Sequence, residues 1–187
     1  MKRGVISFLA VVAVLSPGLL AGASAFELKS PDILPDRPIG QKFAYNSDGC
    51  DGQNISPELV WGDPPEGTKS FAVVVHDLDA PTNGVGFFHW IVADIPASER
   101  SLAQGAGTAD GKKLAPGSRQ LENDYGDIGW GGLCPPPRAR AHRYNFTVYA
   151  LGLERLSLPA NAKASVAESV IIKNAFATAT ISARYCR

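Results

Sequence analysis

The sequence predicts a mostly β protein with one helix near its C-terminus. Residues 71–75 (FAVVV) form a continuous apolar run, which is typical of a strand covered on both faces. Residues 142–151 (HRYNFTVYAL) alternate between two faces, as a half-buried strand does. Residues 162–176 carry apolar side chains at helical spacing instead. Strands therefore dominate, and the helical component is small.

The remaining elements follow from local composition. The expected order is a short strand and a proline-rich connector in 26–43, a loop in 46–57, a strand in 58–61, strands in 71–75 and 87–95, a long irregular surface segment in 97–124, a loop in 125–137, a strand in 142–151, a helix in 162–176 and a last strand in 177–185. In the helix, we expect Val166, Val170 and Ile171 to face inward and Glu168 and Lys173 to face outward.

The first 25 residues are predicted to be a signal peptide rather than part of the fold. Lys2 and Arg3 supply a positive start, an apolar stretch follows, and residues 23–25 (ASA) form a small-residue cleavage site. The alternative is a membrane anchor, but Pro17 interrupts the apolar stretch and leaves it short for a span. We therefore expect residues 26–187 to form a single exported domain, periplasmic or secreted, with no later transmembrane segment.

The cysteine count permits a disulfide in an oxidising compartment. Of the three cysteines, Cys50 and Cys134 lie in glycine- or proline-rich loops, where a bridge is easily accommodated. They are the first candidate pair, with Cys186 left over. Sequence does not determine the pairing, and three unpaired thiols is the alternative.

The balance of charge excludes one class of partner. The whole chain has 18 basic and 18 acidic residues, and removal of Lys2 and Arg3 with the signal peptide leaves a slight acidic excess. Such a chain lacks the basic field that nucleic-acid binding requires.

Carboxylates and an imidazole gather where the central strands meet a loop. Asp77 and Asp79 follow the run 71–75, and residues two apart in an extended segment point to the same side. A glycine-containing loop then leads to the strand 87–95, which carries His89 near its start, so the two strands form a hairpin or a crossover within one sheet. Buried polar groups are costly unless they are paired or used.

His142 and Tyr144 open a later strand beside another loop. Imidazole and phenol groups donate hydrogen bonds, and an aspartate behind an imidazole fixes its tautomer. Together with Asp77, Asp79 and His89, they are suited to hold a small anion. Each residue alone is as readily explained by packing or turn formation, and His76, on the opposite side of its strand, is assigned to core packing.

Other chemistries receive less support from the same residues. The two histidines and two aspartates could ligate a divalent ion, but no HExxH helix accompanies them, so we predict no metal and no cofactor. No G-x-S-x-G motif indicates a nucleophile, and residues 105–113 (GAGTADGKK) lack the spacing of a phosphate loop.

Several ordered motifs resemble the phosphatidylethanolamine-binding protein family, and within it the bacterial Raf-kinase-inhibitor-like branch. They are ISPELVW at 55–61, GTKSF at 67–71, HDLDAP at 76–81, HW at 89–90, GGLCPP at 131–136 and HRY at 142–144. The resemblance implies an antiparallel β-sandwich of a large and a small sheet with an anion pocket at one end. It implies that Asp77, His89, His142 and Tyr144 line the pocket and that Pro135 and its loop form the rim.

Three positions depart from the family pattern. Leu78 stands where the family usually has proline between the aspartates, Leu133 replaces the proline before Cys134, and Arg138 replaces a common glycine. The departures alter the rim, so we expect Arg138 or Arg140 to add positive charge at the mouth and favour phosphate-bearing ligands.

The function expected from this reading is that of an exported binding protein, not an enzyme. Its ligand would be phosphate, a phospholipid head group or a carboxylate. One alternative is an interaction or inhibitor module that acts through 97–124 on an extracytoplasmic protease or host protein. Another is a slow hydrolase with Asp77 and His89 as base, and a homodimer is also open. Because unperturbed histidine titrates near pH ~6.5, we expect phosphate binding to strengthen as the pH falls from roughly 7.5 to 6.

Overall fold

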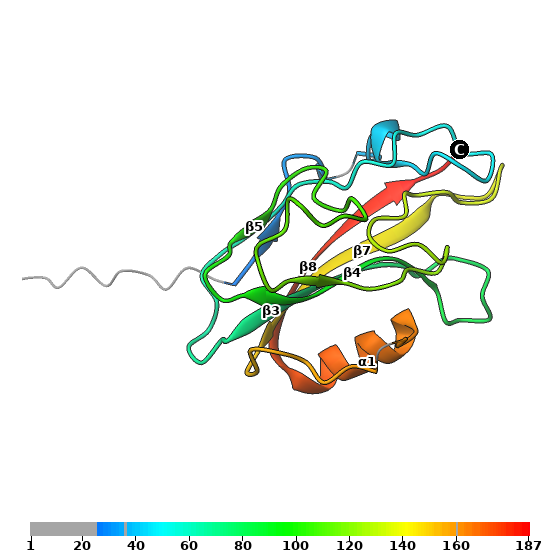
Figure 1. Cartoon of the computed structure of the whole chain (residues 1–187). Coiled ribbons are helices and arrows are strands. Elements are labelled where there is room, and N and C mark those ends of the chain that lie inside the picture. The colour runs from blue at the N-terminus through cyan, green and yellow to red at the C-terminus, as the bar shows by residue number, and fades with distance from the viewer. Residues whose placement is uncertain (1–25, 36, 160) are drawn as a thin grey trace, which may run out of the picture.

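Two antiparallel sheets form the body of the protein in this computed structural model, which describes residues 26–35, 37–159 and 161–187 (Figure 1). The small sheet has the order β1 (Leu28–Lys29), β2 (Leu59–Trp61), β5 (Ser101–Leu102). The large sheet has the order β6 (Arg119–Gln120), β4 (Phe87–Pro96), β3 (Ser70–Asp77), β7 (His142–Leu151), β8 (Ala175–Tyr185). A 3-10 turn, η1 (Gln41–Phe43), and a helix, α1 (Ala164–Asn174), complete the elements of the described residues. The expected sandwich with a C-terminal helix is confirmed.

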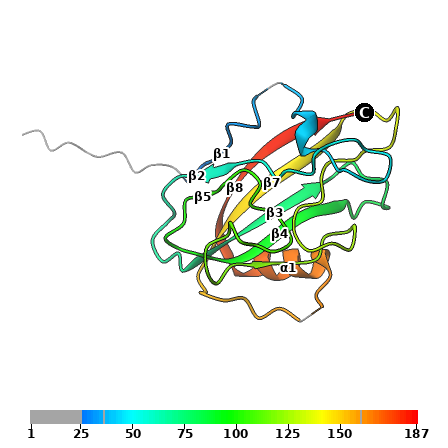
Figure 2. The ribbon, with the colours of Figure 1, turned by 45° about the horizontal axis from the view of Figure 1, so that its top comes forward.

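The large sheet is covered on both faces. Phe71, Val73 and Val75 of β3 point into a core shared with the small sheet. Ala72 and Val74 point to the other face, into a second core under α1. Figures 1 and 2 show α1 on the side of the large sheet away from β1, β2 and β5. This burial on both faces explains why the sequence of β3 contains an unbroken apolar run.

The hairpin of β3 and β4 brings the polar residues to one end of the large sheet. Asp77 pairs with Phe87 of β4 and with Tyr144 of β7, so three strands meet there. Position 86 in the connecting loop accepts only glycine. Gly86 has a φ of +79°, and the Cβ of any other residue there would lie 2.1 Å from the His76 ring.

The helix buries a face that only partly matches the expected one: Ile171 is buried and Val170 packs against the same core, as predicted. Ala164, Ala167 and Ile171 are buried, whereas Val166 is 44% exposed. Glu168, expected outward, is half-buried with a carboxylate oxygen 3.7 Å from Nδ1 of His76. Small alanines allow the helix to approach the sheet closely, and this packing decides its rotation more than the count of apolar residues does. His76 stacks on Phe88 at 4.0 Å between ring centroids, as its assignment to packing predicted.

The segment 97–124 is less irregular than expected, because it contains β5 and β6. Its turns are hydrogen-bonded to other segments, for example through the Gly105 N–H to the Ser56 carbonyl at 2.8 Å and the Leu121 N–H to the Ile91 carbonyl at 3.0 Å. Strands of two residues have no periodicity that a sequence can reveal.

Within the described part of the chain, no helix has the length and apolar character needed to span a membrane. The predicted signal peptide, residues 1–25, lies outside the described residues.

Candidate functional site

A cavity of about 220 Å³ lies at the end of the large sheet where β3 ends and β4 and β7 begin. Larger surface hollows among the described residues, of about 300, 320, 410 and 490 Å³, contain neither His89 nor His142. The smaller cavity contains both imidazoles, and its lining residues are Asp77, Ala80, Pro81, Thr82, Phe87, His89, Tyr125, Cys134, Pro135, Pro136 and His142.

Asp77 and His142 form a buried pair in the wall of this cavity. The Nδ1–H of His142 donates to Oδ2 of Asp77 at 2.7 Å, and the residues are only 5% and 3% exposed. The other oxygen of Asp77 accepts from the Asp79 N–H at 2.9 Å. Because Nδ1 is engaged by the carboxylate, the nitrogen that His142 has available for a ligand is Nε2.

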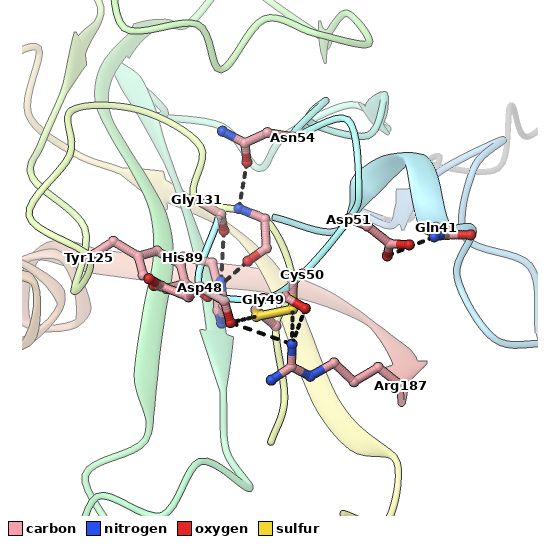
Figure 3. Close-up of a disulfide and its surroundings, with 12 residues drawn as sticks. Gln41, Asp48, Gly49, Cys50, Asp51, Asn54, His89, Tyr125, Gly131 and Arg187 are labelled. Carbon is pink, nitrogen blue, oxygen red and sulfur yellow. Dashed lines mark hydrogen bonds between the residues drawn. A yellow bond between two sulfur atoms is a disulfide. The ribbon is translucent and has the colours of Figure 1, made fainter. Parts of the chain in front are cut away.

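His89 is held just as firmly, but by the backbone. Its Nδ1–H donates to the Gly131 carbonyl at 2.7 Å, and its own carbonyl accepts from the Gly131 N–H at 2.8 Å (Figure 3). Burial lowers the pKa of His89 to about 4, against the opposing effects of the Gly131 carbonyl and the Asp77 charge. A neutral ring protonated on Nδ1 presents a lone pair at Nε2, so at neutral pH His89 accepts a hydrogen bond rather than donating one.

This protonation state corrects the expectation that both histidines titrate near the unperturbed value. That value assumes contact with water, and His89 is only 2% exposed. In the free protein, His89 does not become an imidazolium between pH 7.5 and 6.

Tyr144 is not among the residues that line the cavity, but its ring lies close to both imidazoles. Its ring is 5.2 Å from the ring of His89 and 6.4 Å from that of His142, centroid to centroid. Its hydroxyl is buried near Asp77 but has no hydrogen-bond partner of good geometry among the described residues. Burial and the Asp77 charge raise the pKa of Tyr144, so the hydroxyl keeps its proton and remains a potential donor.

Asp79, Arg138 and Arg140 lie outside the cavity. The strand ends at Asp77, so the two-residue alternation does not extend to Asp79, and the expectation that both carboxylates face one way is wrong. Asp79 instead accepts from the Arg143 N–H at 2.8 Å and faces Arg140 at 3.4 Å. Arg138 is exposed, and neither arginine lines the mouth.

The rim of the cavity is fixed by a disulfide. Cys50 and Cys134 are bonded, as the first candidate pair predicted, and they join the loop 46–57 to the loop 125–137 (Figure 3). The guanidinium of Arg187 donates to the Gly49 carbonyl and lies 3.2 Å from the Cys50 sulfur. Cys186 is an exposed free thiol.

Sequence reasoning missed Asn54 and Tyr125. The Asn54 amide donates to the Trp130 carbonyl at 3.2 Å and accepts from the Gly132 N–H at 2.7 Å. These two hydrogen bonds hold the loop in which the Gly131 carbonyl orients His89. Tyr125 lines the cavity and donates to the Gly132 carbonyl at 3.1 Å. Both residues lie in loops and act through partners distant in sequence, so no local pattern identifies them.

We expect Asn54→Ala to lower the free energy of unfolding by about 2 kcal/mol, since two hydrogen bonds to the loop backbone are lost. The residue also has a φ of +52°, which alanine adopts reluctantly. Asn83→Ala is the matched control, because Asn83 has a φ of +58° but is exposed. Urea denaturation of both variants separates the effect of the two Asn54 hydrogen bonds from the effect of the backbone conformation. Equal losses of unfolding free energy in the two variants would show that these hydrogen bonds do not stabilise the loop.

The described residues contain no group of three or more His, Cys, Asp or Glu side chains that could hold a metal ion. Asp79, one of the two aspartates considered as metal ligands, lies outside the cavity and accepts a hydrogen bond from the Arg143 N–H.

Known proteins resemble this chain over most of its length. The family model for phosphatidylethanolamine-binding protein matches residues 29–186. The UPF0098 protein YbcL of Escherichia coli (strain K12) is 42% identical over 165 residues, which cover 88% of this chain and 90% of YbcL. The crystal structure of E. coli YbcL matches with a TM-score of 0.84 and 40% identity, covering 88% of this chain and 99% of that one. The putative lipoprotein LppC of Mycobacterium tuberculosis (strain ATCC 25618 / H37Rv) is 36% identical over 154 residues, which cover 82% of this chain and 68% of LppC.

Proposed function

This chain belongs to the phosphatidylethanolamine-binding protein family, and from that premise we propose that it is a binding protein for a small phosphate-bearing anion. Membership of the family implies a ligand pocket in general terms. The narrower proposal depends on one observation, namely that both buried imidazoles use Nδ1 within the protein and leave Nε2 for a ligand.

The two Nε2 atoms favour a ligand that carries both a proton and a charge. Neutral His89 accepts a hydrogen bond at Nε2. The Asp77 carboxylate at Nδ1 of His142 places a negative charge behind that ring, an arrangement that suits donation from its Nε2 to an anion. A phosphate monoester monoanion offers a P–O–H group to His89 and a charged oxygen to His142. A carboxylate is a poorer match, because it has no proton to donate at neutral pH.

The rest of the cavity supports a small head group with a short apolar extension. Phe87, Pro81, Pro135 and Pro136 supply apolar walls, and these exclude water and strengthen the polar contacts at the base. A phospholipid head group is one source of such a ligand, and a soluble phosphate ester is another.

We expect the affinity for a phosphate monoester to rise about tenfold as the pH falls from 7.5 to 6, because the monoanion becomes abundant near its second pKa of about 6. Chemical shifts of the His89 ring and the Gly131 amide, followed by NMR during titration, measure binding at the cavity. Dimethyl phosphate is the control ligand, because it has no second proton and its charge is constant over this range. A monoester affinity that does not change with pH would contradict the proposed proton contact.

We further propose that the protein acts outside the cytoplasm. Support comes from the predicted signal peptide, from the Cys50–Cys134 disulfide and from the lipoprotein name carried by LppC. Fractionation of cells that express the full chain, with alkylation to count free thiols, tests this: one free thiol in an extracytoplasmic fraction is expected, and three in the cytoplasm would oppose it.

A further inference from the structure

Three arginines surround a second hollow that the proposed function does not use. This hollow, which we call the arginine hollow, has a volume of about 320 Å³ and is lined by Asp79, Arg140, Ala141, Arg143 and Arg184. Arg143 and Arg184 are exposed, whereas their strand neighbours His142, Tyr144 and Tyr185 are buried on the opposite face. The arginine hollow therefore lies on the other side of the large sheet from the cavity.

Two of these arginines are direct cross-strand neighbours. Arg143 of β7 pairs with Arg184 of β8 in the register of the sheet. The Arg143 carbonyl accepts from the Leu78 N–H, and the Arg184 carbonyl accepts from the Ile39 N–H, so both carbonyls point away from the partner strand. Such a pair is the closely spaced, non-hydrogen-bonded kind, in which like charges directly opposite each other are destabilising.

The surrounding carboxylates do not neutralise this charge. The single acidic residue in the lining is Asp79, whose two oxygens already face Arg140 and the Arg143 N–H. Within residues 26–35, 37–159 and 161–187, no carboxylate forms an ion pair with the guanidinium of Arg143 or Arg184. Three arginines and one aspartate leave the arginine hollow with a net charge of +2.

We propose that the arginine hollow is a second anion site that binds a phosphate dianion. Guanidinium groups donate in a planar fork that matches phosphate oxygens, and they stay protonated at every physiological pH. The charged groups that face the ligand are Arg140 and Arg143 from the β7 side, Arg184 from β8 and Asp79 from the turn after β3. The three guanidinium groups of the lining can only donate hydrogen bonds, and the Asp79 carboxylate is already engaged by other groups. The arginine hollow therefore favours the dianion, whereas the cavity favours the monoanion.

The test uses inorganic phosphate at pH 8, where the dianion predominates, with the backbone amides of Leu78 and Arg143 followed by NMR. The variant is the double substitution Arg143→Gln/Arg184→Gln. The control is Lys29→Gln/Lys112→Gln, which removes the same amount of charge from side chains that are 77% and 82% exposed elsewhere. We expect the affinity at these amides to fall by more than about tenfold in the arginine variant and to be unchanged in the lysine variant.

Melting temperature gives an independent measure that does not depend on assignments. Without phosphate, the arginine variant should melt at the same temperature as the parent chain or higher, because a like-charge pair has been removed. With phosphate, the parent chain should gain melting temperature at pH 8 and the arginine variant should gain less. Equal gains in the parent chain and in the arginine variant would overturn the second site.

A second experiment distinguishes a lipid phosphate from a soluble phosphate as the ligand. The protein is sedimented with phosphatidylcholine vesicles that either contain or lack phosphatidic acid. Sedimentation that needs both phosphatidic acid and the two arginines supports a lipid monoester, and a response to inorganic phosphate alone supports a soluble one. The site is refuted if the protein responds to neither phosphatidic acid nor inorganic phosphate. It is also refuted if the arginine and lysine variants lose equal amounts of binding. His89→Gln should leave the arginine-dependent response intact, so failure at the cavity and failure at the arginine hollow are distinguishable.

Discussion

Reduction of the Cys50–Cys134 disulfide is expected to lower the free energy of unfolding by about 4 kcal/mol. The two cysteines are 84 residues apart in the sequence, so the bridge closes a long loop and removes much of the entropy of the unfolded chain. It also joins the two loops that shape the rim of the cavity. Urea denaturation of the oxidised protein and of a Cys50→Ala/Cys134→Ala variant measures the loss.

Cys186→Ala is the control for this experiment. Cys186 is an exposed free thiol, so its replacement should change the stability by less than about 0.5 kcal/mol. The double alanine variant should also bind phosphate monoesters more weakly, because Cys134 and Pro135 line the cavity. A loss of stability below about 1 kcal/mol would show that the unfolded chain is not constrained as loop closure requires.

The parts of the fold that the sequence could predict are those whose pattern repeats. In β7, buried positions alternate with exposed or half-buried ones over residues 142–148, and the bounds of the strand coincide with the predicted 142–151. In β3, the apolar run is long enough to show burial on both faces. By contrast, β5 and β6 have two residues each and exist through their pairing partners alone.

The direction of a site residue could be predicted from the sequence where the residue lies within a strand. It could not be predicted where the residue lies beyond the end of a strand. His142 and Tyr144 are two apart within β7, and both are buried on the same face. Asp79 is also two residues from Asp77, but it lies beyond the end of β3 and turns to Arg140 and Arg143. The position of a strand end is decided by pairing with distant segments.

The protonation of His89 was hidden for a related reason. A pKa depends on how much water reaches the ring and on which group accepts its proton, and here both are set by the Gly131 loop. The sequence places His89 and Gly131 in different motifs and contains no sign that one is buried against the other.

The stability of the ligand-free protein is expected to fall by about 3 kcal/mol as the pH decreases from about 6.5 to about 4. Burial lowers the pKa of His89 from 6.5 to about 4 in the folded state, so the unfolded chain binds this proton first. The stability from neutral, buried His89 is therefore fully present above pH 6.5 and is lost as the pH falls through about 4. Urea denaturation at closely spaced pH values measures the slope.

Two comparisons assign that slope to His89. His89→Gln should remove most of it, while His76→Gln should keep it, because His76 is a half-buried histidine that stacks on Phe88 outside the cavity. Saturating phosphate monoester should also flatten it, since a bound anion beside Nε2 stabilises the protonated ring that burial alone disfavours. If phosphate left the slope of the parent chain unchanged while still binding, the ligand would not contact His89, and the proton contact proposed for the cavity would have to be abandoned.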